Sequence, residues 1–249
     1  MKKIKSILIS QPEPEAKSPY ASIEKKYNLN VGFCPFITIE GVTTKEFRKQ
    51  RIQIDKFPGV IFTSRNAMEQ YFRLCEELRY TISQETKYFC VSEAIALYLQ
   101  KFIQYRKRKV FYGNGTMKDL QTLLNKHKAS TKKFMLPCSD TSSPAIPNFL
   151  KENGYEYKEA IMYRTIHSPE LEDLTIKDYD MIVFFSPFSV DAMLEKFPDF
   201  EQGDTRIAGF GTSTCAKIEK SGFRIDIKAP IPEARSMSVA IDRYMKSLA

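Results

Sequence analysis

The sequence predicts an α/β protein in which mostly parallel sheets carry helices on both faces. Runs rich in β-branched and aromatic residues alternate with helical periodicity along almost the whole chain. Residues that favour helix starts and helix ends stand between these runs. In addition, segments of the first half recur in the same order in the second half, which predicts two related α/β units.

Ten runs have the composition and length of β-strands. They are short, as strands buried between helices usually are. The predicted strands are Ile4–Ile9, Val31–Ile39, Gly59–Thr63, Lys87–Val91, Val110–Tyr112, Phe134–Pro137, Tyr157–Thr165, Met181–Phe185, Arg206–Phe210 and Arg224–Ile227.

Helical spacing is clearest in three stretches, which begin at Ala67, Ala145 and Met237. In the first, apolar residues recur every three or four positions from Met68 onward. The other two extend over Ala145–Asn153 and Met237–Leu248. These periods predict amphipathic helices that pack one face against a sheet.

Residues that cap helices support the same boundaries. Ser186 followed by Pro187 is the preferred order of N-cap and first helical residue. Thr116, with an Asp three residues later, resembles a weak capping box. Gly154 and Gly222 each follow a helical run and precede a strand, as C-cap glycines do.

The internal repeat is most evident in two stretches, "VIFTSRNA" from Val60 and "IVFFSPFS" from Ile182. Each is a strand-like run followed by a Ser and a helical pattern. Further along, "KYFCVSEAIALYL" from Lys87 resembles "TRIAGFGTSTCAKIE" from Thr205, and "SILIS" from Ser6 resembles "FMLPC" from Phe134. The repeat indicates equivalent strand–turn–helix corners in two units.

Composition limits the class of protein. The chain has 249 residues, a formal net charge of +8 and 43% hydrophobic residues, which suits a folded protein that attracts anions. No apolar run approaches the length of a membrane-spanning helix, and the run after the basic start is too short for a signal peptide. We therefore expect a cytoplasmic protein with no membrane partner.

Cysteine and histidine do not point to a metal or disulfide site. The five cysteines have no paired spacing, so we expect buried thiols, although Cys138 stands at a strand end. His127 and His167 have no partner at metal-ligand spacing and are expected at the surface. We expect no metal and no cofactor, and an enzymatic reaction here would proceed without histidine acid–base chemistry.

Three turns after predicted strands carry hydroxyl groups at the start of a helix, where backbone N–H groups attract anions. A Ser or Thr at such a turn can simply cap its own helix. The recurrence of the turns in both units favours anion binding. The predicted binding residues are Ser64, Arg65 and Asn66, then Ser186, Pro187, Phe188 and Ser189, then Gly211, Thr212, Ser213 and Thr214.

Two other stretches suggest nucleotides or nucleic acid at first sight. "YGNGT" at Tyr112–Thr116 lacks the third Gly of a dinucleotide loop, so we interpret it as a turn before a helix. "YRKRK" at Tyr105–Lys109 is the densest basic run, but no nucleic-acid-binding module surrounds it. We interpret it as a solvated loop.

Together, several of these segments resemble the uroporphyrinogen-III synthase family over nearly the whole chain. Their order and spacing carry the resemblance more than any one of them. The segments are "VIFTSRNA" (60–67), "GYEYKEAIMYRT" (154–165), "DMIVFFSPFSV" (180–190), "IAGFGTST" (207–214) and "APIPEARSMSVAI" (229–241).

The resemblance implies two flavodoxin-like, doubly wound lobes joined by a two-stranded linker. One lobe is discontinuous and combines Met1–Ile37 with Ser168–Ala249; the other is Glu40–Ala160. The linker strands are expected near Cys34–Ile39 and Ile161–His167. With this arrangement, the helix corners at Ser64 and Ser186 are expected at the rims of one inter-lobe cleft.

The implied substrate is hydroxymethylbilane, a linear tetrapyrrole with many carboxylates, which suits the basic charge and the anion-binding turns. The implied lyase reaction loses the terminal hydroxyl, inverts the last pyrrole ring through a spiro intermediate and closes the macrocycle. Tyr163 matches the family's proton donor for hydroxyl departure; a phenol stays protonated at neutral pH and can donate. Its other interpretation is a plain aromatic strand residue.

The sequence differs from the family pattern at Gln11, where many members have Arg, and at Ser92 and Ile95, where Gly and Thr are expected. These differences motivate one alternative, a non-catalytic two-lobed binder of an anionic ligand. The basic run motivates another, a nucleic-acid-binding protein. The leading interpretation is a monomeric enzyme without nucleic-acid partners that receives substrate by transient hand-over from hydroxymethylbilane synthase.

Overall fold

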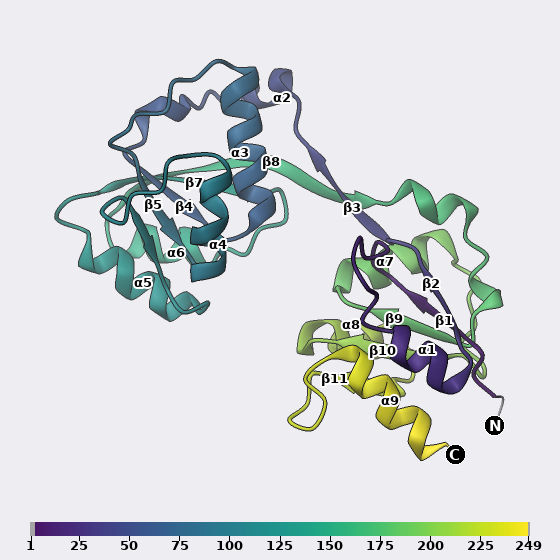
Figure 1. The fold of residues 1–249 in the computed structure, drawn as a ribbon. Coiled ribbons are helices and arrows are strands. Elements are labelled where there is room, and N and C mark those ends of the chain that lie inside the picture. The colour runs from purple at the N-terminus through teal and green to yellow at the C-terminus, as the bar shows by residue number, and fades with distance from the viewer. Residues whose placement is uncertain (1–2, 249) are drawn as a thin grey trace. The chain divides into compact units, whose positions relative to one another are not determined.

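The computed structural model describes residues 3–248 and contains two open, mostly parallel sheets with helices on both faces. The predicted α/β class is confirmed. Backbone contacts divide the chain into two compact units (Figure 1). Unit 1 comprises 1–38 and 166–249, and unit 2 comprises 39–165.

Unit 1 holds a five-stranded sheet in the order β11-β10-β9-β1-β2, with parallel pairing throughout. Short 3₁₀ turns at Pro169–Asp173 and Ile176–Asp178 lie near the start of its second segment. The elements are β1 (Ser6–Ile9), α1 (Ala21–Tyr27), β2 (Asn30–Phe33), β9 (Met181–Phe184), α7 (Pro187–Lys196), β10 (Arg206–Phe210), α8 (Thr212–Lys220), β11 (Ile227–Ala229) and α9 (Met237–Ser247).

Helices cover both faces of this sheet because its strands are apolar on both sides. On one face, Ile7 and Ile9 pack with α1 and α9, which Figure 1 shows side by side although they come from opposite ends of the chain. Lys26 and Tyr27 of α1 bond to Asp242 of α9. On the other face, the intervening Leu8 packs with α7 and α8.

Unit 2 holds a six-stranded sheet in the order β3-β8-β7-β4-β5-β6. From β8 to β6 all pairs are parallel. The elements are β3 (Ile37–Gly41), α2 (Thr44–Lys49), β4 (Gly59–Phe62), α3 (Arg65–Glu77), β5 (Lys87–Cys90), α4 (Glu93–Tyr98), β6 (Val110–Tyr112), α5 (Met117–Lys126), β7 (Lys133–Ser139), α6 (Ala145–Glu152) and β8 (Glu156–His167), with 3₁₀ turns at Ile54–Lys56 and Leu99–Lys101.

Alternate residues of β4 show how the two faces of this sheet are covered. Val60 and Phe62 pack into a cluster with α2, α3 and α4. Ile61 points to the opposite face and packs with α5 and α6. Both crossings of the chain between the units fall inside strands, at 38–39 within β3 and at 165–166 within β8.

Most predicted strands are found within one or two residues, and β6 and β10 match in full. Two predictions were wrong. Val31–Ile39 is two strands of different sheets, β2 and β3, because Pro35 lacks an N–H and Phe36 is buried in the core of unit 1. The last strand is Ile227–Ala229 rather than Arg224–Ile227.

Helix ends follow the predicted capping residues. Ser186 and Thr116 accept hydrogen bonds from backbone N–H groups of α7 and α5. Gly154 and Gly222 adopt φ of 67° and 84°, the left-handed region that favours glycine. No helix among residues 3–248 is long and apolar enough to cross a membrane.

Candidate functional site

Each sheet has one point where the chain leaves two neighbouring strands in diverging directions, through helices on opposite faces, and such switch points are where open α/β sheets bind ligands. In unit 2 this point lies between β4 and β7, because α3 and α6 cover opposite faces. In unit 1 it lies between β1 and β9, where α1 and α7 diverge. Ser64 follows β4 after one intervening residue, and Ser186 follows β9 in the same way. Each predicted serine therefore lies at the switch point of its own sheet.

Ser64 is the N-cap of α3. Its extended backbone directs the Oγ atom back over the helix, where it accepts a hydrogen bond from the N–H of Ala67 at 3.1 Å. The same Oγ lies 3.3 Å from the phenolic oxygen of Tyr163. Arg65 and Asn66 lie in the first turn of the helix, where backbone N–H groups point outward. The structure thus brings the predicted tyrosine to the predicted turn.

Tyr163 reaches this turn from β8, two strands away from β4 in the sheet. A register shift between Cys138 and Ser139 of the intervening β7 pairs Ser139 with Tyr163. Irregularities of this kind change the direction in which side chains point. The Tyr163 ring is half-buried against the cluster that contains α3, and its hydroxyl ends at the helix cap. Its backbone carbonyl accepts a hydrogen bond from the N–H of Asp140.

Arg65 lies over an aromatic ring that the sequence did not point to. Its guanidinium carbon is 5.0 Å from the ring centroid of Tyr98 in α4, a cation–π distance. The Tyr98 hydroxyl donates a hydrogen bond to Glu69. Among residues 3–248, Arg65 is within ion-pairing distance of no carboxylate. Its charge is therefore held at the start of α3 and is available to an anion.

The second predicted turn begins α7 of unit 1. The Oγ of Ser186 accepts a hydrogen bond from the N–H of Phe188 at 3.1 Å, and Pro187 occupies the first helical position. The Phe188 side chain is exposed. Ser189 is almost fully buried, so its side chain faces the protein rather than the solvent at this turn.

The third turn begins α8. Gly211 has φ of +90°, a backbone region that L side chains rarely adopt, and its N–H donates to the Ala229 carbonyl at 2.6 Å. Thr212 and Ser213 are exposed at the start of the helix, whereas Thr214 is buried. The turn presents backbone N–H groups and two hydroxyls to solvent.

The segment that corresponds to this turn in unit 2 is built differently. Ser92 precedes α4 and makes no side-chain cap, and it forms an isolated bridge with Asn114. The exposed carboxylate of Glu93 accepts a hydrogen bond from Tyr112 in the first turn of the helix. A negative charge at this position disfavours a bound anion, whereas the first turn of α3, after Ser64, contains no acidic residue.

Sequence reasoning missed the loop that follows β7. Because β7 and β4 are neighbours at the switch point, this loop lies beside the turn at Ser64 that follows β4. Ser139 and Ser142 hydrogen-bond to each other, and Ser143 accepts a hydrogen bond from the N–H of Ala145. The signal was present in "CSDTSSP", a hydroxyl-rich run that follows a strand. The sequence alone did not place that strand next to β4.

The remaining candidate chemistry is structural. All five cysteines are free and buried, as predicted. The prediction for His127 was wrong in part, because its ring packs 4.0 Å from that of Phe111, and burial lowers its pKa. His167 is exposed, 3.6 Å from Glu195. No cluster of three or more His, Cys, Asp or Glu side chains among residues 3–248 is arranged to hold a metal ion.

Comparisons with known proteins agree on one family. The family model described as "Uroporphyrinogen-III synthase HemD" matches residues 18–238. A uroporphyrinogen-III synthase of Chlorobaculum parvum is 25% identical and covers 98% of this chain and 100% of its own length. Two crystal structures share the fold, each at a TM-score of 0.61 and 17% identity. A substituted uroporphyrinogen III synthase of Thermus thermophilus matches over 98% of this chain and 99% of its own. The uroporphyrinogen-III synthetase of Helicobacter pylori matches over 99% of this chain and 100% of its own.

Proposed function

Because this chain belongs to the uroporphyrinogen-III synthase family, we propose that it uses Tyr163 and the helix turns at Ser64, Ser186 and Gly211 to cyclise hydroxymethylbilane. The family activity is that of a lyase. The observation that carries the assignment of residues is the contact between Ser64 and Tyr163, since it unites an anion-suited helix start with a proton donor. The assignment does not depend on histidine or a metal.

Substrate binding is the first task in this proposal. Carboxylate side chains of the tetrapyrrole are attracted to the N-terminal ends of α3, α7 and α8, where unpaired backbone N–H groups carry partial positive charge. Arg65 adds a full charge at α3 that no protein carboxylate neutralises among residues 3–248. Thr212 and Ser213 add hydroxyl donors at α8. A net charge of +8 favours the approach of such a substrate.

Hydroxyl departure is the second task. In the proposal, the phenol of Tyr163 gives its proton to the terminal hydroxyl as the carbon–oxygen bond breaks, so that water leaves and an azafulvenium-like cation remains on the substrate. The Oγ of Ser64 already accepts the Ala67 N–H, and its own proton can be donated to the tyrosine oxygen. This donation stabilises the phenolate that forms, and the proton lost when the pyrrole regains aromaticity restores the phenol.

Ring inversion and closure are the third task. The cation is intrinsically reactive, so the protein contributes mainly by holding the substrate in a conformation that spontaneous closure does not favour. Sites built on the ends of buried strands suit this role, because β4, β9 and β10 are held rigidly in the cores of their units.

Two further proposals concern partners. Since hydroxymethylbilane closes spontaneously, we propose that hydroxymethylbilane synthase hands it over directly in a transient contact. We also propose that the chain acts as a monomer. Among residues 3–248, exposed large apolar residues occur on separate elements within each unit, for example Leu97 on α4 of unit 2 and Phe188 and Val239 on α7 and α9 of unit 1.

A rate measurement tests the function. Hydroxymethylbilane is generated with its upstream deaminase, this protein is added, and the remaining linear substrate is quantified at short intervals by chromatography after rapid oxidation. Substrate is expected to disappear faster in proportion to the amount of protein. A rate that stays at the spontaneous value at every protein concentration would contradict the proposal.

A further inference from the structure

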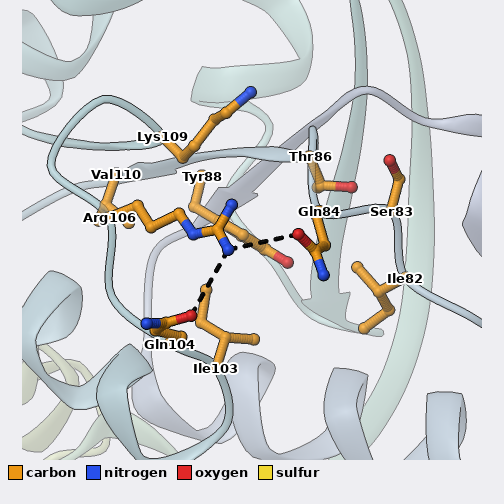
Figure 2. A pocket seen from close by; sticks show the side chains of 10 residues that line it. All are labelled: Ile82, Ser83, Gln84, Thr86, Tyr88, Ile103, Gln104, Arg106, Lys109 and Val110. Atoms are coloured by element: carbon orange, nitrogen blue, oxygen red, sulfur yellow. Dashed lines mark hydrogen bonds between the residues drawn. The ribbon is translucent and has the colours of Figure 1, made fainter.

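A small pocket opens on unit 2 at the amino-terminal ends of β5 and β6 (Figure 2). Its volume is about 230 Å³. The pocket residues Thr86 and Lys109 immediately precede the two strands, whereas Ser64 and Ser92 follow the carboxyl ends of β4 and β5. Since β4, β5 and β6 are parallel, the pocket lies at the amino-terminal ends of the strands, opposite the carboxyl ends where the turn at Ser64 lies. It is separate from the candidate site described above.

Two largely buried residues present hydroxyl groups to this pocket, and within the part of the chain that the structure describes neither hydroxyl has a protein partner. Tyr88 is 3% exposed and Thr86 is 5% exposed, and both line the cavity. Neither side-chain hydroxyl hydrogen-bonds to another group among residues 3–248, and neither oxygen is sealed from solvent. Figure 2 shows the Tyr88 side chain extending among the lining residues toward the side of Gln84 and Ile82. Buried polar groups are normally satisfied, so unpaired donors at a cavity wall indicate a ligand or water.

The charge at the pocket mouth belongs to Arg106. The other lining cation, Lys109, is ion-paired with Glu85, and this pair lowers the pKa of the Glu85 carboxyl. Arg106 instead donates long hydrogen bonds to the amide oxygens of Gln84, at 3.3 Å, and Gln104, at 3.5 Å (Figure 2). No carboxylate among residues 3–248 is within ion-pairing distance of Arg106. Its guanidinium is therefore hydrogen-bonded to neutral groups, and among residues 3–248 its electrostatic interaction with Glu85 is not a direct ion pair.

Ser83 also lines the pocket, and another part of the wall is apolar. Ile82, Ile103 and Val110 contribute the hydrocarbon surface, and Tyr88 contributes its ring. A free inorganic anion would leave this surface in contact with water. The volume lies below the range of about 300–1,000 Å³ that is typical for drug-sized ligands, so only a small molecule fits.

We propose that this pocket binds a small, planar aromatic carboxylate. The flat fork of Arg106 matches the two oxygens of a carboxylate, and the hydroxyls of Tyr88 and Thr86 supply further donors. Ile82, Ile103 and Val110 contact the aromatic body. This assignment also gives a role to the basic run at Tyr105–Lys109, which the cyclisation reaction does not use.

Benzoate is the probe that tests the proposal on the full-length protein, with isothermal calorimetry for affinity and amide chemical shifts for location. We expect one saturable site, with shifts concentrated at residues 82–88 and 103–110. Benzamide has the same shape without the charge and is expected to bind at least about 10-fold more weakly, because hydrogen bonds to charged groups are stronger. Inorganic phosphate is expected to bind more weakly as well.

Matched variants assign the contacts. Arg106→Gln is expected to weaken benzoate binding by about 10-fold or more, and Tyr88→Phe by several-fold. Arg108→Gln removes the same charge from an exposed position of the same loop and is expected to leave binding unchanged. Tyr88→Phe removes a hydroxyl that has no hydrogen-bond partner among residues 3–248, so the variant is expected to unfold no earlier than the wild type.

Three results would overturn the proposal. The first is the absence of saturable benzoate binding, which would mean that water alone fills the pocket. The others are equal affinity for benzoate and benzamide, and an equal loss of benzoate affinity in Arg106→Gln and Arg108→Gln. If Arg106→Gln fails to fold, Arg106→Lys keeps the charge without the planar fork. That variant is expected to bind benzoate several-fold more weakly, and unchanged affinity would contradict bidentate recognition.

Discussion

The hydroxyl oxygens of Ser64 and Tyr163 lie 3.3 Å apart, although Ser64 follows β4 and Tyr163 lies in β8, and β7 separates these two strands in the sheet. Ser64 caps α3 through the Ala67 N–H and touches the tyrosine with the same atom. One serine therefore fixes a helix start, which attracts anions, and orients a phenol, which can donate a proton. The two roles can be separated by mutation.

Removal of the Tyr163 hydroxyl tests its role as proton donor. Tyr163→Phe is expected to lower the turnover rate by about 10- to 100-fold, since positioned acids contribute about 10²–10⁴-fold and this substrate is already reactive. The ring stays in its cluster and only one side-chain hydrogen bond is lost, so thermal unfolding is expected to change little. A wild-type turnover rate from the folded variant would remove Tyr163 from the mechanism.

Loss of the Ser64 cap should affect both stability and rate. Ser64→Ala is expected to destabilise unit 2 by about 1 kcal/mol, the usual value of an N-cap, and to slow turnover by misorienting Tyr163. Ser236→Ala is the matched control, because Ser236 caps α9 of unit 1 through the Val239 N–H and belongs to none of the three predicted turns. Equal turnover rates in the two alanine variants would show that Ser64 only caps its helix.

Gly211 is expected to resist substitution because of its backbone. At φ of +90°, an alanine is strained, which costs about 1–2 kcal/mol or shifts the start of α8. Gly211→Ala should therefore raise the KM for hydroxymethylbilane. Gly203→Ala places alanine at φ of +46° in an open turn and serves as a control for backbone strain. If both variants keep the wild-type KM, the turn at Gly211 does not bind substrate.

Acid unfolding of unit 2 should depend on Glu46. Hydrogen bonds from the Thr43 backbone N–H and side chain, and then from Arg164, lower the pKa of this carboxyl to about 2. A folded-state pKa below the unfolded value means that the stabilisation is present above the unfolded pKa and is lost as pH falls toward 2. Urea unfolding midpoints between pH 5 and pH 2 should thus fall more steeply for the wild type than for Glu46→Gln. Identical slopes of midpoint against pH for the wild type and Glu46→Gln would contradict this account. Glu152→Gln, which removes a carboxylate at an exposed position of α6, is the control.

The buried thiols should react slowly in the native protein. Burial raises the pKa of Cys34 and Cys138 to about 11 and that of Cys75 and Cys90 to about 12, so little reactive thiolate forms at neutral pH. Labelling with a disulfide reagent is expected to be slow until denaturant is added, when all five cysteines react. Rapid labelling without denaturant would show that at least one thiol is accessible.

The sequence predicted local elements well wherever periodicity and caps agreed. The helix starts at Ser64, Thr116 and Ser186 were readable because one side chain and one backbone N–H determine each of them. The shift of the last strand had a different cause. Asp226 accepts the backbone N–H of Ile207 through its side chain, and the side chain of Gln202 accepts the N–H of Arg224. Side chains therefore supply part of the hydrogen bonding there, beside one backbone bond from the Asp226 N–H to the Ile207 carbonyl.

The candidate site was only partly predictable for a physical reason. Ser64 and Tyr163 were both identified, but their contact depends on the order of strands in the sheet, which local sequence does not encode. The same limitation hid Tyr98 beneath Arg65 and the serine loop after β7. The pocket at Tyr88 was also hidden, because the basic run resembles a solvated loop until its neighbours in space are known.

The isomer composition of the product tests the central claim most directly. Hydroxymethylbilane is supplied continuously by its synthase, the products are oxidised, and uroporphyrin isomers are separated by chromatography with and without this protein. We expect isomer III, in which the terminal ring is inverted, to predominate when the protein is present. Isomer I alone, in the proportion formed without the protein, would contradict the account.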